Sequence, residues 1–149
     1  MPFKKVNVVD DFIEKLRQQP DLQVYEMDTC WEIKFVHKAV YTFVITIPKS
    51  VFEWFVSLYI DESQEEWSDW VEWYEGGEIT EQNLKNYYKA DIWHFIEKLR
   101  QASEFRLEID PGFKFLGKEF FKTKFLEGKF HGNWEKIYAG SLPEDFTLH

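Results

Sequence analysis

The residues best able to do chemistry gather in one stretch, 61–81, which holds nine Asp or Glu residues, three of the seven tryptophans and no Lys or Arg. Two carboxyl groups that face each other can hydrolyse a glycosidic bond, one as the acid and the other as nucleophile or base. Carboxylates such as Asp61, Glu65 and Asp69 could instead hold a hard cation. Carboxylates beside indole rings also suit the recognition of a basic protein surface.

Neither catalysis nor metal binding by this stretch has further support in the sequence. A catalytic carboxyl group needs burial to raise its pKa, and no member of this densely charged stretch stands out as a buried one. The looped Asp-x-Asp-x-Asp-Gly spacing that wraps calcium is also absent. The stretch is therefore better explained as a binding surface than as an active site.

The other reactive side chains are scattered along the chain. The four histidines stand apart, at positions 37, 94, 131 and 149, and a single cysteine cannot form a Cys-x-x-Cys metal site. Cys30 lies in DTCWEIKF, which has the pattern of a strand, so a buried thiol is a simpler interpretation than a Cys–His dyad. No Gly-rich phosphate loop and no Gly-x-Ser-x-Gly turn occurs. We expect no catalytic residue, no cofactor and no metal.

The net charge of −9 comes from the same stretch. Residues 1–60 carry 7 basic and 8 acidic side chains, and residues 82–149 carry 11 basic and 10 acidic ones, so the two flanks cancel. Nucleic acids and anionic membranes need cations on the protein, and their binding to 61–81 is disfavoured. A basic protein partner is favoured.

Composition predicts one folded domain spanning 1–149. The chain is 44% hydrophobic and 19% aromatic, which is enough for a single core. No apolar run is long enough for a signal peptide or a membrane span, and one cysteine allows no internal disulfide. These features predict a cytoplasmic protein.

The elements that must position the acidic stretch follow from hydrophobic periodicity. Apolar residues spaced as on a helix predict one from about Asp10 or Asp11 to Pro20, and alternation over 22–60 predicts about four strands. Within that range, 50–60 could also be a short helix. Helical spacing resumes over 62–75 and 80–102, on either side of Gly76-Gly77. Short strands separated by turn signals follow Ser103, so the predicted fold is α+β, a mostly antiparallel sheet with about three helices on one face.

The predicted helix over 62–75 separates the aromatic residues from the charged ones. Trp67, Trp70, Val71 and Tyr74 recur at i, i+3, i+4 and i+7, which predicts a buried stripe. Trp73 falls among the carboxylates, either as an exposed anchor for a partner or packed under the following loop. The predicted partner-binding residues are Asp61, Glu62, Glu65, Glu66, Asp69, Glu72, Trp73 and Glu75.

A small, acidic, cysteine-poor α+β chain that is rich in Trp and Phe and lacks a catalytic motif resembles the immunity proteins of bacterial contact-dependent inhibition and related polymorphic toxin systems. The resemblance implies a non-enzymatic inhibitor that binds the C-terminal domain of a toxin, often a basic nuclease, and blocks its active site or another essential surface. It transfers no functional residue to this sequence.

Two alternatives stay open. The acidic and aromatic residues could serve a carbohydrate-active or other enzyme, or the chain could be a structural or adaptor domain with no dedicated acidic site. An upstream reading frame that encodes a large secreted protein with a variable C-terminus would favour the immunity function.

Overall fold

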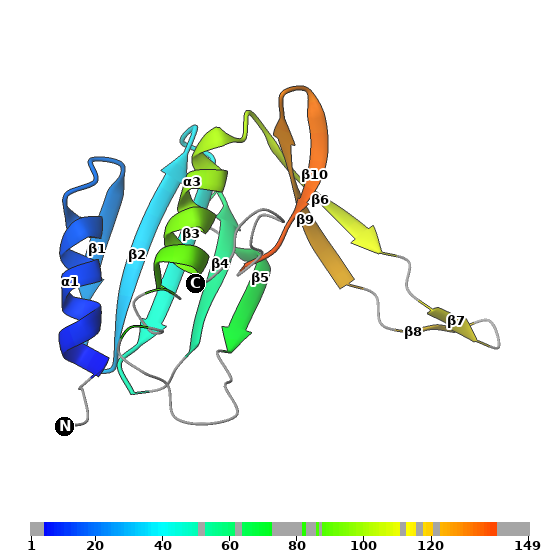
Figure 1. Cartoon of the computed structure of the whole chain (residues 1–149). Helices are drawn as coiled ribbons and strands as arrows, with labels where there is room; N and C mark the ends of the chain where they lie inside the picture. The colour runs from blue at the N-terminus through cyan, green and yellow to red at the C-terminus, as the bar shows by residue number, and fades with distance from the viewer. Residues whose placement is uncertain are drawn as a thin grey trace.

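The computed structural model describes residues 5–50, 53–61, 64–72, 82, 86, 88–110, 113–115, 118–120 and 123–139. The chain is α+β, with a five-stranded antiparallel sheet, a three-stranded antiparallel sheet and a two-stranded hairpin (Figure 1). Two helices lie against one face of the larger sheet: α1 (Lys5–Arg17), and a π-helical turn η1 (Tyr88–Trp93) that leads into α3 (His94–Gln101). The fold class is confirmed, but the described residues hold two helices rather than about three.

The five-stranded sheet is a meander in which each strand pairs with the next along the chain. The predicted four strands over 22–60 are confirmed, and the ambiguous segment 50–60 contributes a strand. Side chains on these strands alternate between the helix-covered face and the opposite face, as period-two sequences require. The strands are β1 (Leu22–Glu26), β2 (Cys30–His37), β3 (Tyr41–Pro48), β4 (Glu53–Ile60) and β5 (Gln64–Glu72).

The predicted helix over 62–75 is wrong, because β5 occupies its centre. β5 pairs with β4 from Gln64 to Glu72, with Trp67 opposite Leu58 and a bulge at Leu58/Tyr59. Two effects favour the strand. Pairing satisfies the backbone groups along β4. An extended strand also separates carboxylates at i and i+4 by about 13 Å, whereas a helix would stack them as close neighbours of like charge. Tryptophan and valine also have high strand propensity.

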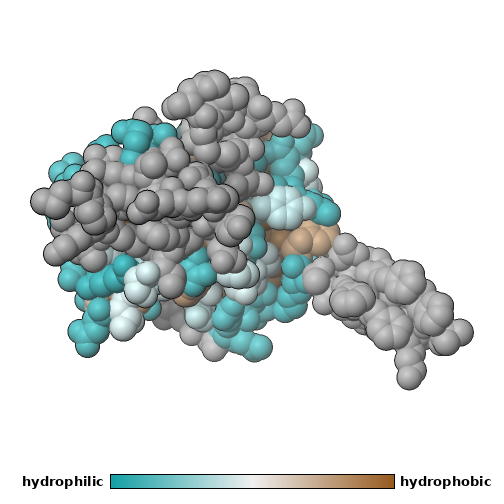
Figure 2. Space-filling view, turned by 60° about the horizontal axis from the view of Figure 1, so that its bottom comes forward, coloured by the Kyte–Doolittle hydropathy of each residue, from teal (hydrophilic) through white to brown (hydrophobic). Residues whose placement is uncertain are grey.

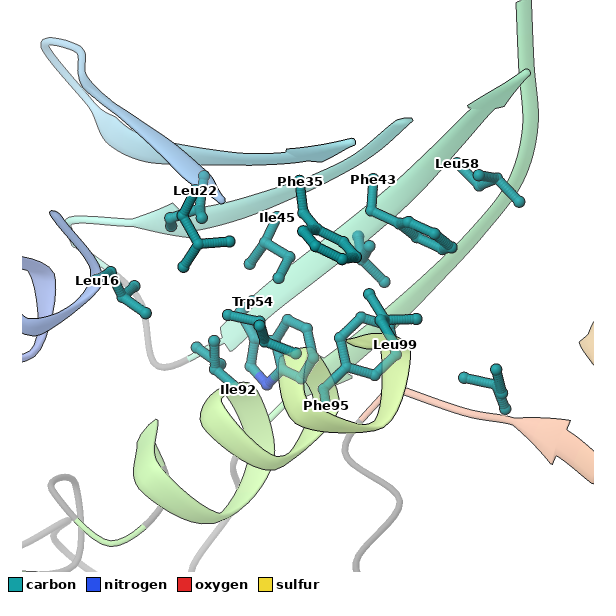
Figure 3. Packing of buried hydrophobic residues seen from close by; sticks show 14 of the residues in the cluster. Leu16, Leu22, Phe35, Phe43, Ile45, Trp54, Leu58, Ile92, Phe95 and Leu99 are labelled. Carbon is teal, nitrogen blue, oxygen red and sulfur yellow. The ribbon is translucent and has the colours of Figure 1, made fainter. Parts of the chain in front are cut away.

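The core fills the space between the helices and the larger sheet. In Figure 3, Ile92, Phe95 and Leu99 of the η1–α3 helix point toward the sheet. Phe95 meets the fully buried Trp54 edge-on, with ring centroids 5.5 Å apart. Each such aliphatic or aromatic side chain contributes about 1.5–3 kcal/mol on burial. The helix-facing side of the sheet is therefore closed to partners where these helices cover it.

The helix boundaries differ from the prediction at their N-terminal ends. Helix α1 begins at Lys5, earlier than Asp10, and ends at Arg17 before Pro20. The predicted helix over 80–102 is confirmed from Tyr88 to Gln101, although its first six residues form a π-helix. Gly76-Gly77 and most of 80–87 lie outside the described residues. No helix among the described residues is long and apolar enough to cross a membrane.

The C-terminal strands form the second sheet, in the order β10-β9-β6, with β6 (Phe105–Asp110), β9 (Thr123–Phe130) and β10 (Asn133–Ile137). A two-residue turn joins β9 to β10, because His131 (φ 51°) and Gly132 (φ 84°) both adopt the left-handed conformation of a tight hairpin. Between β6 and β9, the hairpin of β7 (Phe113–Phe115) and β8 (Lys118–Phe120) projects away from both sheets (Figure 1).

Candidate functional site

The candidate site is the face of the five-stranded sheet that points away from α1 and α3, here called the open face. Cross-strand pairing places one row of its side chains across all five strands. The row is Tyr25, Glu32, Thr46, Phe55 and Trp70. The other open-face residues whose side chains are described are Gln23, Cys30, Lys34, Val36, Thr42, Val44, Pro48, Glu53, Ser57, Tyr59, Glu65 and Ser68.

Three aromatic side chains of this row are exposed to solvent. The exposed fractions are 56% for Trp70, 48% for Tyr25 and 36% for Phe55. The indole Nε1 of Trp70 donates a hydrogen bond to Glu53 Oε2 at 2.9 Å, which holds the ring at the surface. Large exposed aromatic side chains grouped on one face mark an interaction surface more often than single ones do.

The charges on the open face are mainly negative. Among the side chains that the structure describes there, three carboxylates, those of Glu32, Glu53 and Glu65, share the face with the ammonium group of Lys34. No ion pair between described residues involves Glu32, Lys34 or Glu65. The carboxylates of Glu32 and Glu65 are therefore available to a basic partner.

The structure divides the predicted acidic surface among several places. Glu65 lies on the open face, but Glu66 pairs with Lys124 of β9 at 3.3 Å. Asp69 accepts hydrogen bonds from the backbone N–H groups of Trp70 and Ala139, at 2.9 and 2.8 Å, so it links β5 to the segment after β10. The prediction of a continuous acidic face on a helix is therefore wrong.

The remaining predicted site residues are at or beyond the ends of β5. Asp61 is exposed in the turn before β5, with φ of 59°. Glu72 pairs across the strands with Glu53, and its side chain lies outside the described residues. Glu62, Trp73 and Glu75 also lie outside them, so the exposure of Trp73 stays a prediction.

The predicted burial of the tryptophans is half right. Trp67 is buried, at 7% exposure, as predicted, whereas Trp70 was predicted in the core and is 56% exposed on the open face. On a strand, two positions three apart point to opposite faces, while on a helix they share one. Predicting a helix in place of β5 therefore placed Trp70 on the buried face instead of the exposed one.

Five open-face residues with a charge or an exposed ring escaped the sequence analysis: Tyr25, Glu32, Lys34, Glu53 and Phe55. The sequence did contain a sign that Phe55 is exposed. Trp54, Phe55 and Val56 are consecutive apolar residues, so a strand must point them to both of its faces. One of two adjacent large rings must then face away from the core.

A shallow groove of about 470 Å³ lies on the open face. Its lining residues come from β1 to β4 and the turn after β1. They are Tyr25, Met27, Glu32, Lys34, Thr42, Val44 and Tyr59. The volume is within the range of about 300–1,000 Å³ that ligand pockets span, but the groove is largely open to solvent.

Other parts of the described surface offer less. At the end of the molecule seen in Figure 2, the described residues are mainly hydrophilic, with hydrophobic colour in small areas. Among the described residues, no three His, Cys, Asp or Glu side chains come together to hold a metal ion. Cys30 is half-buried at the start of β2.

The clearest pKa shifts belong to groups away from the open face. The Arg100 guanidinium bonds both carboxylate oxygens of Asp21, at 2.7 and 2.6 Å, and lowers the pKa of that carboxyl group. Burial lowers the pKa of His37, whose ring lies against Phe35, Tyr41 and Phe105. Both groups hold elements together rather than face a ligand.

Comparison with known proteins adds no family to this geometry. No family model matches the chain, and neither a curated protein nor a solved structure matches it.

Proposed function

We propose that the protein is a bacterial immunity protein that neutralises a toxin by binding its basic C-terminal domain through the open face. The observation that carries the proposal is the row of exposed rings at Tyr25, Phe55 and Trp70, set among the carboxylates of Glu32 and Glu53. A few residues carry most of the binding energy in protein interfaces, and Trp and Tyr are enriched among them. Surrounding charges contribute to partner choice and to the association rate.

The sign of the charge favours a basic partner over a second copy of the chain. Two open faces packed against each other would bring carboxylates onto carboxylates, which costs several kcal/mol at an interface. A nucleic acid or an anionic membrane would meet the same repulsion. In this proposal the protein acts in the cytoplasm, without catalysis or cofactor, by covering a functional surface of the toxin.

The direct test pairs the protein with the C-terminal domain encoded by an upstream secreted-protein reading frame. Co-expression of the protein should restore the growth of cells that produce the toxin domain, and the purified protein should bind the purified toxin domain. Trp70→Ala should weaken binding by about 2 kcal/mol or more, because the most exposed ring of the row is lost from the contact. Tyr138→Ala is the matched control, since Tyr138 is 49% exposed but lies outside the open face. A wild-type chain that neither binds nor protects, or equal losses in both variants, would contradict the proposal.

A further inference from the structure

The groove on the open face holds two charges that the described chain leaves unneutralised. Glu32 and Lys34 both line it and are both half-buried, yet no ion pair joins them to each other or to another described residue. Half-buried charges without partners are costly, because they lose part of their hydration and gain no counter-charge. A ligand that supplies both counterparts would recover this energy.

The surroundings of Glu32 define one half of that ligand. Cross-strand pairing places Tyr25 directly beside Glu32 on β1, and Met27 and Tyr59 line the groove further along. Tyrosine rings attract a cation over their faces, and an apolar side chain such as that of Met27 packs against an aliphatic stem. A long cationic side chain fits this set.

The surroundings of Lys34 define the other half. Lys34 lies between Val44 of β3, which has no acceptor side chain, and Gln23 of β1. The amide oxygen of Gln23 already accepts a hydrogen bond from the Tyr25 hydroxyl group at 2.9 Å. A free metal or amine cation in the groove would be repelled by Lys34. A cationic peptide would also be attracted to Lys34, because its main-chain carbonyl oxygens can accept hydrogen bonds from the ammonium group.

We propose that the groove receives an arginine side chain from an extended segment of the basic partner, with the guanidinium on Glu32 and a neighbouring carbonyl oxygen on Lys34. Arginine fits better than lysine because its planar guanidinium bonds a carboxylate with two parallel hydrogen bonds and stacks on an aromatic ring. The inference rests on the proposed function, since it takes the partner to be basic. It adds the place where one partner residue binds and the contacts that recognise it.

The test is an NMR titration of the ¹⁵N-labelled full chain with the capped peptide Ac-Gly-Arg-Gly-NH₂. The citrulline peptide of the same shape is the control ligand, because it replaces the guanidinium by an uncharged urea group. The arginine peptide should shift the amide signals of groove residues and bind about tenfold or more tightly than the citrulline peptide. Equal affinity for both peptides, or shifts spread over the acidic surface, would overturn the proposal.

Three variants identify the contacts. Glu32→Gln should abolish the preference for arginine, whereas Glu135→Gln, an exposed carboxylate on β10, should leave it unchanged. Lys34→Gln separates two explanations. If Lys34 holds a peptide carbonyl, its loss weakens binding. If the groove only attracts positive charge, its loss strengthens binding, and the proposed recognition is wrong. Thermal unfolding of each variant checks that the fold is kept.

The outcomes separate this inference from the proposed function. A chain that binds the toxin domain through Trp70 but shows no preference for the arginine peptide overturns the groove assignment alone. A chain whose groove selects arginine, but which binds and protects against no toxin domain, overturns the proposed function alone.

Discussion

Trp67 and Trp70 have similar sequence surroundings and different physical roles. Both precede or follow carboxylates in β5, yet Trp67 is buried against the core and Trp70 is 56% exposed. The difference lies in side-chain direction, since odd and even offsets on a strand point to opposite faces. Burial, not residue type, therefore decides what each ring contributes.

Replacing each of the two tryptophans by alanine should separate stability from binding. Trp67→Ala should lower the free energy of unfolding by about 3–5 kcal/mol, because it leaves a cavity in the core. Trp70→Ala should lower it by less than about 1 kcal/mol, since an exposed ring and one exposed hydrogen bond are lost. Urea denaturation of both variants measures the two values. Similar losses for both would mean that Trp70 is covered.

His37 predicts how stability depends on pH. Its ring is packed among Phe35, Tyr41 and Phe105, and its Nδ1 is buried with no hydrogen-bond partner. Burial lowers the pKa of His37 below its ordinary value of 6.5, while a hydrogen bond to the Ala102 backbone opposes that shift and the charge of Lys38 adds to it. The unfolded chain therefore binds a proton at a higher pH than the folded one.

The contribution of His37 should be complete above pH 6.5 and should be lost as pH falls through the lower pKa of the folded state. The free energy of unfolding, measured by urea denaturation between pH 7.5 and about 5, should fall, and His37→Phe should reduce the fall. His131→Asn is the control, because His131 is exposed in a turn and Asn accepts its positive φ. If both variants lose as much stability at low pH as the wild type does, groups other than His37 cause the loss.

At the scale of elements, β5 is where local pattern and structure disagree. The spacing of Trp67, Trp70 and Val71 matches a helix, but Trp67 and Val71 also share one face of a strand. A local pattern cannot choose between the two. The backbone of β4 can, because its hydrogen-bonding groups would otherwise form an unpaired sheet edge. The sequence of β5 fits both a helical and a strand period, and pairing with β4 selects the strand.

The β7–β8 hairpin should be dispensable for folding. Its strands pair with each other, and it projects from the end of the β6–β9 ribbon (Figure 1). Replacing 111–122 by Asn-Gly would close Asp110 to Thr123, which are already paired, with a tight two-residue turn. The free energy of unfolding should change by no more than about 1 kcal/mol, since the shorter loop also costs less entropy. A large loss in a thermal melt would show that this segment packs on the body.

At the scale of the whole molecule, the structure redistributes the acidic charge. The sequence concentrates the net −9 in 61–81, but the fold places Glu66 and Asp69 in internal contacts and brings Glu32 and Glu53 to the open face beside Glu65. The negative surface is therefore assembled from three strands rather than one segment.

Association with a basic partner should depend on these open-face charges. Changing Glu32, Glu53 and Glu65 together to Gln should lower the association rate with the toxin domain and weaken its dependence on salt, because steering by charge is screened by ions. Changing Glu14, Glu104 and Glu135 removes the same charge elsewhere, and the loss in rate should be smaller. Stopped-flow measurements at several salt concentrations give both rates. Equal losses would mean that total charge, not the open face, steers binding.

By itself, the sequence determined the α+β class, the meander over 22–60, the burial of Trp67 and the concentration of acidic residues. These follow from alternation, side-chain hydrophobicity and composition, which are local properties. Only the tertiary structure decided that 64–72 is a strand, that Trp70 faces solvent and that Tyr25, Glu32 and Phe55 join it in one row. These facts depend on which strand pairs with which and on which face the helices cover, and both are set by contacts between residues far apart in the chain.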